Sequence, residues 1–489
     1  MTTSALAKYE LVIGLEVHAQ LRTESKLFSP AAVSYGLEPN HSVEVVCLAL
    51  PGVLPVLNER AVDLAILAGL ATHCTVHTRS VFARKNYFYP DLPKGYQISQ
   101  FEEPLATDGW IEIPVEEGAA PGGVKRIGIT RLHMEEDAGK SIHDPAVAGS
   151  DATLVDLNRS GVPLVEIVSE PDLRSPEEAG AYLRALRLVL RYIQVSDADM
   201  ERGNFRCDAN VSLRPRGSEE LGIRTELKNL NSFRFVEAAI AAEARRQAEV
   251  LESGGEIHQA TMAYDAASDR TRVLRLKEDA HDYRYFPDPD LIPLVFSSAH
   301  VESLRAQLPE LAEQKCERFQ REYGLSAYDA RQLSASRALA EFFEAATRNG
   351  TAKSVANWLL RDVLQALGDL EIEIDESQLT PQALATLIQL VESGKTTAKS
   401  ARGLVPELVR RGGDPAELVR ERGLEAVSDT GVLAAAVDEV IAEHPGNAEK
   451  FRAGEAKVLN FLMGQVMRRT QGKADAATVR ELLIQRLKE

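Results

Sequence analysis

The sequence is poor in cysteine, and its four cysteines lie far apart: Cys47, Cys74, Cys207 and Cys316. No two of them form a Cys-x-x-Cys pair, so neither a zinc knuckle nor a disulfide framework is indicated. Reduced thiols are typical of a cytosolic protein, and we expect a cytoplasmic location.

Long apolar runs are also missing. No segment reaches the roughly 20 apolar residues that span a bilayer, and the first ten residues lack the apolar stretch of a signal peptide. We therefore expect no membrane association.

Positive charge is the second deficit, because 56 Lys and Arg residues stand against 73 Asp and Glu residues, a net charge of −17. Such a chain repels phosphate backbones, which argues against sequence-independent nucleic-acid binding and against a DNA partner. An RNA partner would need a local basic surface. In residues 447–489, nine Lys or Arg minus five Asp or Glu gives +4. This stretch fits an RNA-backbone contact, and an ordinary solvated helix face explains the same composition.

The two common nucleotide-binding motifs are absent as well. Gly139-Lys140-Ser141 ends like a P-loop, but Met134 stands where the first glycine of that motif is required. No Rossmann fingerprint occurs either. Any ATP site is therefore of another design.

What the sequence does contain divides it into a β-rich part and a helical part. A chain of 489 residues is too long for one ordinary core, which predicts two or three domains. Short β-type segments prevail up to about Leu294, and helix follows helix after it. We predict an α+β fold with a mostly antiparallel-sheet N-terminal domain (residues 1–294). A helical domain (295–413) and a C-terminal helical tail domain (414–489) follow.

Apolar and polar residues alternate strictly in two segments, Leu11–Leu21 and Asn204–Pro215. This pattern predicts antiparallel strands with one face on the core and the other open to solvent or ligand. Helices are expected after the capping sequence Ser175-Pro176-Glu177-Glu178 and after Asn231-Ser232. Further helices are expected over Ser336–Arg348, Ala352–Leu367, Pro381–Val391 and Asn447–Thr470.

Several of these strands have acidic residues on their polar faces. Glu166 is the most informative, because it lies in the apolar strand Pro163–Val168, where a carboxylate is costly unless it is paired or metal-bound. If the strands share one sheet, their carboxylates and one imidazole suit Mg²⁺ or Mn²⁺. The acidic candidates, with that histidine, are Glu16, His18, Glu135, Glu136, Glu166, Asp208 and Glu226, and Asp137 directly follows Glu136. Residues on the same segments that would contact a nucleotide are Arg131, His133, Lys140, Arg206 and Lys228. Together they suit phosphoryl transfer, although each acid except Glu166 is, taken alone, more simply a solvated or ion-paired surface group.

Two loop-like segments, Arg84–Gln97 and His281–Asp290, combine cations with aromatic side chains. Such loops stack on a base or ribose while Lys85 and Lys94 meet anions. The alternative is that the aromatic rings only pack the loops onto the core.

Seven motifs in order resemble those of one family, the B subunits of the aspartyl/glutamyl-tRNA amidotransferase (GatB family). They are Ile13–His18, Leu48–Pro55, Arg84–Asp91, Arg131–Lys140, Val165–Asp172, Arg206–Ser212 and Glu226–Ser232. The resemblance covers essentially the whole chain and shows no large inserted domain of the archaeal type.

The resemblance implies an N-terminal cradle domain with a kinase-like site that uses ATP and Mg²⁺, or Mn²⁺. The side-chain carboxylate of Glu-tRNA(Gln), Asp-tRNA(Asn) or both would be phosphorylated and then amidated with ammonia. The amidase (A) subunit would release the ammonia, the small (C) subunit would join the two large subunits, and the helical and tail domains would hold the tRNA. Positions of the family's metal site match Glu16, His18, Glu136, Glu166 and Glu226, with Glu135 adjacent. Positions of ammonia entry match Lys85, Lys94, Glu136 and Asp208. Two alternatives remain: a non-catalytic tRNA-binding scaffold with a structural metal, and a stand-alone metal-dependent hydrolase.

Overall fold

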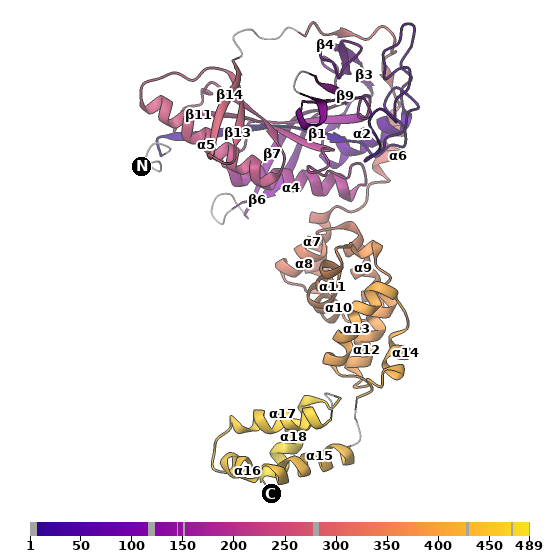
Figure 1. Ribbon diagram of the computed structural model, residues 1–489, viewed down its shortest axis with the longest axis vertical. Helices are drawn as coiled ribbons and strands as arrows, with labels where there is room; N and C mark the ends of the chain where they lie inside the picture. Colours follow the sequence, from indigo (N-terminus) through magenta and orange to yellow (C-terminus); the bar gives the residue numbers. More distant parts are fainter. Residues whose placement is uncertain are drawn as a thin grey trace. The chain divides into compact units, whose positions relative to one another are not determined.

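The computed structural model describes residues 7–115, 123–143, 145–149, 152–276, 283–426, 430–470 and 473–488. The chain forms two compact units, Met1–Leu311 and Ala312–Glu489. The first unit is built on a large sheet and the second is helical, which confirms the predicted α+β class (Figure 1). Among the described residues, no helix combines the length and the apolar character needed to cross a membrane. The four cysteines are free thiols, as expected.

The sheet of the first unit has nine strands, and the N-terminal strand lies in its middle. Their order is β14 (Arg270–Leu276), β13 (Ala260–Asp265), β12 (Thr225–Leu230), β11 (Phe205–Pro215), β1 (Tyr9–Gln20), β10 (Pro163–Ser169), β7 (Val124–Glu136), β6 (Ala106–Pro114) and β2 (Thr75–Val76). Neighbouring strands are antiparallel except β12 and β13, which are parallel.

Helices cover one face of this sheet, as the alternation in the sequence requires. Ile13, Leu15 and Val17 of β1 are buried in the core beneath α2 (Glu59–Ala71), α4 (Pro176–Tyr192) and α5 (Phe233–Glu252). Figure 1 shows α4 and α5 along the same side of the sheet. Both begin as predicted, because the hydroxyls of Ser175 and Ser232 accept hydrogen bonds from backbone N–H groups of the first turn. The opposite face of the sheet is left to polar side chains.

A β-bulge in β7 decides which of its residues reach that polar face. Val168 pairs with Arg131 and Ser169 pairs with Ile129, so Thr130 is an extra residue. Because side chains alternate along a strand, one extra residue exchanges the two faces from that point on. Ile127 and Ile129 therefore enter the core before the bulge, and Leu132 and Met134 enter it afterwards. As a result, Arg131, His133 and Glu135 point to the polar face.

Smaller sheets bring distant loops to the same region. One contains β15 (Phe286–Pro287), β4 (Ala83–Asn86) and β5 (Tyr96–Ser99), so the two aromatic loops lie side by side. His281 and Asp282 of the second loop lie outside the described residues. The others pair β16 (Leu294–Val295) with β3 (Arg79–Ser80) and β8 (Lys140–Ile142) with β9 (Leu154–Asp156). Helices α3 (Pro145–Ala148) and α6 (Ser298–Arg305) complete the unit, and α6 packs on α2.

The second unit contains two separate hydrophobic cores. The first core is formed by α7 (Ala312–Tyr323), α8 (Ala327–Leu333), α9 (Arg337–Thr347), α10 (Ala352–Trp358), a π-helical turn (Leu359–Val363), α11 (Leu364–Leu370), a 3₁₀ turn (Ile374–Glu376), α12 (Pro381–Glu392), α13 (Ala398–Arg411) and α14 (Pro415–Glu421). The second is formed by α15 (Thr430–Glu443), α16 (Pro445–Arg452), α17 (Val458–Arg469) and α18 (Ala476–Lys488).

The predicted single helix over Asn447–Thr470 is wrong, because α16 ends at Arg452 and α17 begins at Val458. Gly454 between them has φ +103°, a left-handed backbone conformation that does not continue a helix.

The predicted limits at residues 294 and 413 differ from the observed cores. Val301 and Leu304 of α6 belong to the core of the first unit, and Val419 of α14 belongs to the first core of the second unit. The division into three domains remains a prediction.

A buried carboxylate joins α5 to the sheet and gives a test of the fold. Glu243 is fully buried and accepts hydrogen bonds from Thr225 of β12 and Thr271 of β14, at 2.7 Å each. Arg246 donates to both of its oxygens, at 2.6 and 2.9 Å. Burial would raise the pKa of Glu243, but the hydrogen bonds from Arg246 and Thr271 lower it.

We expect Glu243→Leu to destabilise the first unit by about 3 kcal/mol, because buried donors lose their acceptor. Urea unfolding followed by fluorescence in a Trp358→Phe background measures this, since Trp110 then remains as the reporter in the first unit. The control is Glu249→Leu on the exposed side of the same helix, where we expect a change within about 0.5 kcal/mol. Equal stability of the two variants would show that the network does not stabilise the sheet.

Candidate active site

A row of polar side chains crosses four adjacent strands on the open face of the sheet. In register, His133 of β7 pairs with Glu166 of β10, Glu166 pairs with His18 of β1, and His18 pairs with Arg206 of β11. Directly paired residues point to the same face with their Cβ atoms about 5 Å apart. The strand register therefore brings together residues that lie up to 188 positions apart in the sequence (206 − 18).

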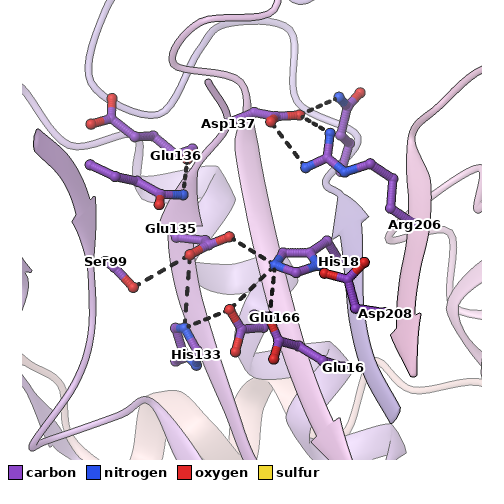
Figure 2. Close-up of polar contacts among 12 residues, drawn as sticks. Glu16, His18, Ser99, His133, Glu135, Glu136, Asp137, Glu166, Arg206 and Asp208 are labelled. Carbon is purple, nitrogen blue, oxygen red and sulfur yellow. Dashed lines mark hydrogen bonds and ion pairs between the residues drawn. The ribbon is translucent and has the colours of Figure 1, made fainter. Parts of the chain in front are cut away.

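His18 is the centre of this row. Its Nε2 atom lies 3.3 Å from Glu166, 3.4 Å from Glu135 and 3.8 Å from Glu16. Figure 2 shows the carboxylates of Glu135 and Glu166 converging on its imidazole ring. Glu135 and Glu166 are both buried, with 2% and 5% of their surface exposed. The sequence predicted this grouping of Glu16, His18 and Glu166, and the structure brings them together.

The cluster has too little positive charge for its carboxylates. Burial would lower the pKa of His18, but the surrounding carboxylates, Glu166 first, raise it to about 9. Burial and the charge of Glu166 raise the pKa of Glu135 to about 7. Burial and Glu166 likewise raise the pKa of Glu16. Burial would raise the pKa of Glu166, but the neighbouring histidines lower it. Glu135 and Glu16 therefore resist ionisation beside a carboxylate that is already charged, which indicates a place where an added cation is stabilised.

The donor atoms fit a divalent cation. Two groups have their ligand atoms within 4.8 Å of one another: Glu16, His18 and Glu166, and His133, Glu135 and Glu166. Burial lowers the pKa of His133 to about 4, so its ring is neutral at neutral pH, the form that ligates metals. Its Nδ1 atom is buried and has no hydrogen-bond partner among the described residues. Carboxylate oxygens with imidazole nitrogens suit Mg²⁺ or Mn²⁺.

On the β11 and β12 side, a lysine joins the acidic groups. Nζ of Lys228 lies 2.5 Å from Asp208 and 3.1 Å from Glu226. Thr261 of β13 donates to Glu226 at 3.3 Å. Burial would lower the pKa of Lys228, but Asp208 and Glu226 raise it. The lysine therefore remains a cation at the edge of the cluster.

On the β7 side, a second lysine faces the cluster from the small sheet. Burial would lower the pKa of Lys85, but the charge of Glu135 heads the interactions that raise it. Its Nζ atom lies 5.1 Å from the centre of the Tyr283 ring. The two aromatic loops therefore hold a cation beside the carboxylates. Beside them, Phe101, which follows β5, stacks on Tyr285 of the second loop with ring centres 4.2 Å apart.

Arg206 forms an ion pair with Asp137, the last residue of the acidic run Glu135-Glu136-Asp137. Its guanidinium donates to both oxygens of buried Asp137, at 2.9 and 3.0 Å. Gln20 donates to the same carboxylate at 3.0 Å. Burial would raise the pKa of Asp137, but Arg206 and Arg159 lower it. This bidentate pair leaves Arg206 less suited to binding a phosphate than the sequence suggested.

Glu136 lies apart from the cluster, although Glu135 belongs to it. Consecutive residues of a strand point to opposite faces, and Figure 2 shows the carboxylate of Glu136 turned away from His18. It accepts hydrogen bonds from Lys94 and, at 2.9 Å, from the backbone N–H of Ile98. Glu136 and Lys94 also line a cavity of about 10 Å³ together with Cys47, Pro93 and Gly161 among others. That volume holds about one water molecule.

Comparison with known proteins agrees with the motifs quoted above. The model of the GatB/GatE catalytic domain matches residues 11–302, and the model of the GatB domain matches residues 341–487. The chain belongs to the GatB family. Relatives named as the B subunit of aspartyl/glutamyl-tRNA(Asn/Gln) amidotransferase align over nearly their whole length. The one from Solidesulfovibrio magneticus is 52% identical over 483 residues, 99% of this chain and 100% of that protein. The one from Geobacter sulfurreducens is 51% identical over 481 residues, 98% of this chain and 99% of that protein.

Two of the metal-site positions that the family resemblance implied lie outside the central cluster. Glu136 is on the other face of β7, and Glu226 lies beyond Asp208 and Lys228. Lys140, which was predicted to contact a nucleotide, also lies outside the cluster. It is exposed at the start of β8, which pairs with β9. Arg131 does lie on the cluster's face, 3.8 Å from Glu166.

Sequence reasoning noted Asp137 as part of an acidic run but gave it no partner or role, and it missed Arg159. Asp137 stands two residues after Glu135, so the strand period would have pointed to it.

Proposed function

We propose that this chain is the B subunit of a tRNA-dependent amidotransferase, which activates a carboxylate esterified to tRNA with ATP. The observation that supports this assignment best is the buried set of carboxylates and histidines around His18, flanked by Lys85 and Lys228. Few protein sites bury several carboxylates without a cation, because each charge is costly away from water. The names of the relatives give the substrate class, aspartyl- or glutamyl-tRNA.

The reaction would occur in two steps. A carboxylate is a poor acyl donor, because its leaving group would be oxide. Transfer of the γ-phosphoryl group of ATP to a carboxylate oxygen forms an acyl phosphate and releases ADP. Neutral ammonia then attacks the acyl carbon, the bond to the phosphate oxygen breaks, and the amide and inorganic phosphate are released.

For the first step, the chain would contribute binding and charge. Glu16, Glu135 and Glu166 with His18 and His133 would hold the divalent cation, and such a cation offsets negative charge on phosphate oxygens. Lys85 and Lys228 would contact the anionic oxygens from opposite sides of the cluster. The bidentate pair of Asp137 and Arg206 would fix β7 against β11 and so position these groups.

For the second step, the chain would contribute the ammonia entry. Glu136 and Lys94 line a cavity of about 10 Å³ on the other face of β7, a volume that suits a molecule of the size of ammonia. Ammonia must be neutral to act as a nucleophile, and Glu136 would accept the proton that ammonium releases. Asp208, held by Lys228 on the cluster's side, is the second candidate for this proton.

The C-terminal helices are the proposed tRNA contact, but their basic surface is smaller than composition suggested. Arg469 pairs with Glu439 and Glu443, and Arg486 pairs with Asp438. These three acids belong to α15, which packs against α17 and α18. Over residues 430–489, nine basic minus eight acidic residues gives +1. The remaining exposed lysines and arginines would have to make this contact.

The decisive experiment is co-expression with the amidase (A) subunit and the small (C) subunit, followed by assays on mischarged tRNA. We expect ATP hydrolysis that requires Glu-tRNA(Gln) or Asp-tRNA(Asn), stops with a metal chelator, and returns with Mg²⁺ or Mn²⁺. Amide formation on the tRNA should follow the same dependence. Binding of tRNA without any tRNA-dependent ATP hydrolysis would instead favour the scaffold with a structural metal.

A further inference from the structure

The sheet ends in an exposed arginine-rich strand that the proposed chemistry does not use. β14 has β13 as its neighbour on one side and is the last strand of the sheet on the other (Figure 1). Its sequence from Arg270 to Leu276 contains three arginines and no acidic residue, and all three arginines are exposed.

The strand register places these arginines on the face of the candidate active site. Arg275 pairs with Thr261 and Arg272 pairs with Ala263. Across the next ladder, Thr261 pairs with Glu226 and Ala263 pairs with Lys228. Paired residues point to the same side of a sheet. Thr271, between the arginines, faces the other way and donates to Glu243 of α5.

The polar face thus changes from acidic at its centre to basic at its edge. The nearest acid by register is Asp265, which pairs with Arg270. Hydrogen bonds from Ser268 and Ala267, and then the charge of Arg272, lower the pKa of Asp265. Residues 260–276 contain three arginines and two aspartates, a local charge of +1 in a chain whose net charge is −17. A basic stripe on an acidic protein favours a polyanionic partner.

The distance from the stripe to the cluster suits the end of a nucleic acid. β14 and β1 are separated by three strands, so the arginines lie about 19 Å from the row that contains His18. Arg270 and Arg272 are two residues apart along a strand, or about 7 Å, which lets each meet a different phosphate. The planar guanidinium is suited to bidentate phosphate contacts.

We propose that Arg270, Arg272 and Arg275 of β14 bind phosphates of the tRNA acceptor arm. The single-stranded 3′ end then extends across Lys228 so that the aminoacyl group reaches the carboxylates around His18. This inference rests on the proposed function, since it requires an aminoacyl-tRNA substrate. Such a stripe has two competing roles: it could dock a strand of a partner protein, or it could protect the sheet edge from aggregation. The test separates both roles from tRNA binding.

The test uses the full chain purified with its partner subunits and unacylated tRNA as the probe. The variant is Arg270→Gln, Arg272→Gln and Arg275→Gln together. The matched control removes three exposed arginines on helices, Arg184→Gln and Arg191→Gln on α4 and Arg305→Gln on α6. Affinity for the unacylated tRNA is measured from low to moderate salt. ATP hydrolysis at saturating mischarged tRNA is the second readout.

We expect the β14 variant to bind tRNA about tenfold or more weakly. The slope of log affinity against log salt should fall by about 2 to 3, because each duplex phosphate contact contributes close to one unit. ATP hydrolysis at saturating mischarged tRNA and assembly with the partners should stay unchanged, and the control should behave as the parent protein. If the β14 variant forms an active complex with the same tRNA affinity and salt slope as the parent, the inference is wrong. It is also wrong if the β14 variant still binds tRNA normally but no longer assembles with a partner subunit. An inactive parent complex would overturn the proposed function instead.

Discussion

Replacing Glu166 with glutamine is expected to lower tRNA-dependent ATP hydrolysis by about 1,000-fold, on the scale of removing one preorganised charge contact from an active site. Glu166 is the one residue shared by both groups of potential metal ligands found among the described residues. It also lies 3.3 Å from His18 and 3.6 Å from His133. Glutamine keeps the shape of the side chain but removes the negative charge that a cation requires.

Metal binding gives a readout of this prediction that does not depend on turnover. We expect the Mn²⁺ dissociation constant of the Glu166→Gln complex, measured by titration with detection of free Mn²⁺, to rise by at least about tenfold. Glu112→Gln on β6 is the control, because Glu112 is a partly exposed carboxylate of the same sheet that pairs with Arg126. Normal Mn²⁺ binding together with normal ATP turnover in the Glu166 variant would remove Glu166 from the site.

Substitutions of two adjacent residues of β7 are expected to impair different steps of the reaction. In the Glu135→Gln complex, ATP hydrolysis and amide formation should fall together, since Glu135 lies 3.4 Å from His18. In the Glu136→Gln complex, amide formation should fall by about 100-fold or more, the scale of a lost general base. Its tRNA-dependent ATP hydrolysis should fall much less, because Glu136 contacts Lys94 and Ile98 on the other face of the strand.

The measurement compares phosphate release with amide formed per tRNA, with glutamine and with ammonium as the nitrogen source. Phosphate release in excess of amide formation is the expected signature of the Glu136 variant. An equal loss of both activities in this variant would place Glu136 with the metal ligands, as the family resemblance implied, and would contradict the separation seen across β7.

Alternation and capping residues were enough to predict much of the first unit. The segment Leu11–Leu21 predicted β1 to within two residues, and Ser175 and Ser232 predicted where α4 and α5 begin. These features depend on neighbours along the chain, which a sequence displays directly. Glu166 was informative for a similar reason, since its apolar flanks predicted burial, and it is 5% exposed.

The parts that could not be predicted depend on pairing between distant segments. The bulge at Thr130 turns His133 and Glu135 toward the polar face, and nothing local in the sequence reveals it. The bidentate pair of Asp137 with Arg206 requires knowing that β7 and β11 lie on either side of β10 and β1. Likewise, the sequence suggested a larger positive charge on residues 447–489 than the structure exposes, because acidic residues of α15 pair with Arg469 and Arg486.

The central position of β1 also affects how the protein is made. This strand ends at Gln20, but its partners β10 and β11 begin at Pro163 and Phe205, so it is synthesised well before them. At a synthesis rate of about 5–20 residues per second, β1 waits roughly 10–40 s before both partners have emerged. During that time an alternating apolar strand has two unpaired edges, which is the condition for non-native association. Chaperone binding to the nascent N-terminal segment, or slower translation before residue 163, should therefore decide the yield of folded chain more than the stability of the finished sheet does.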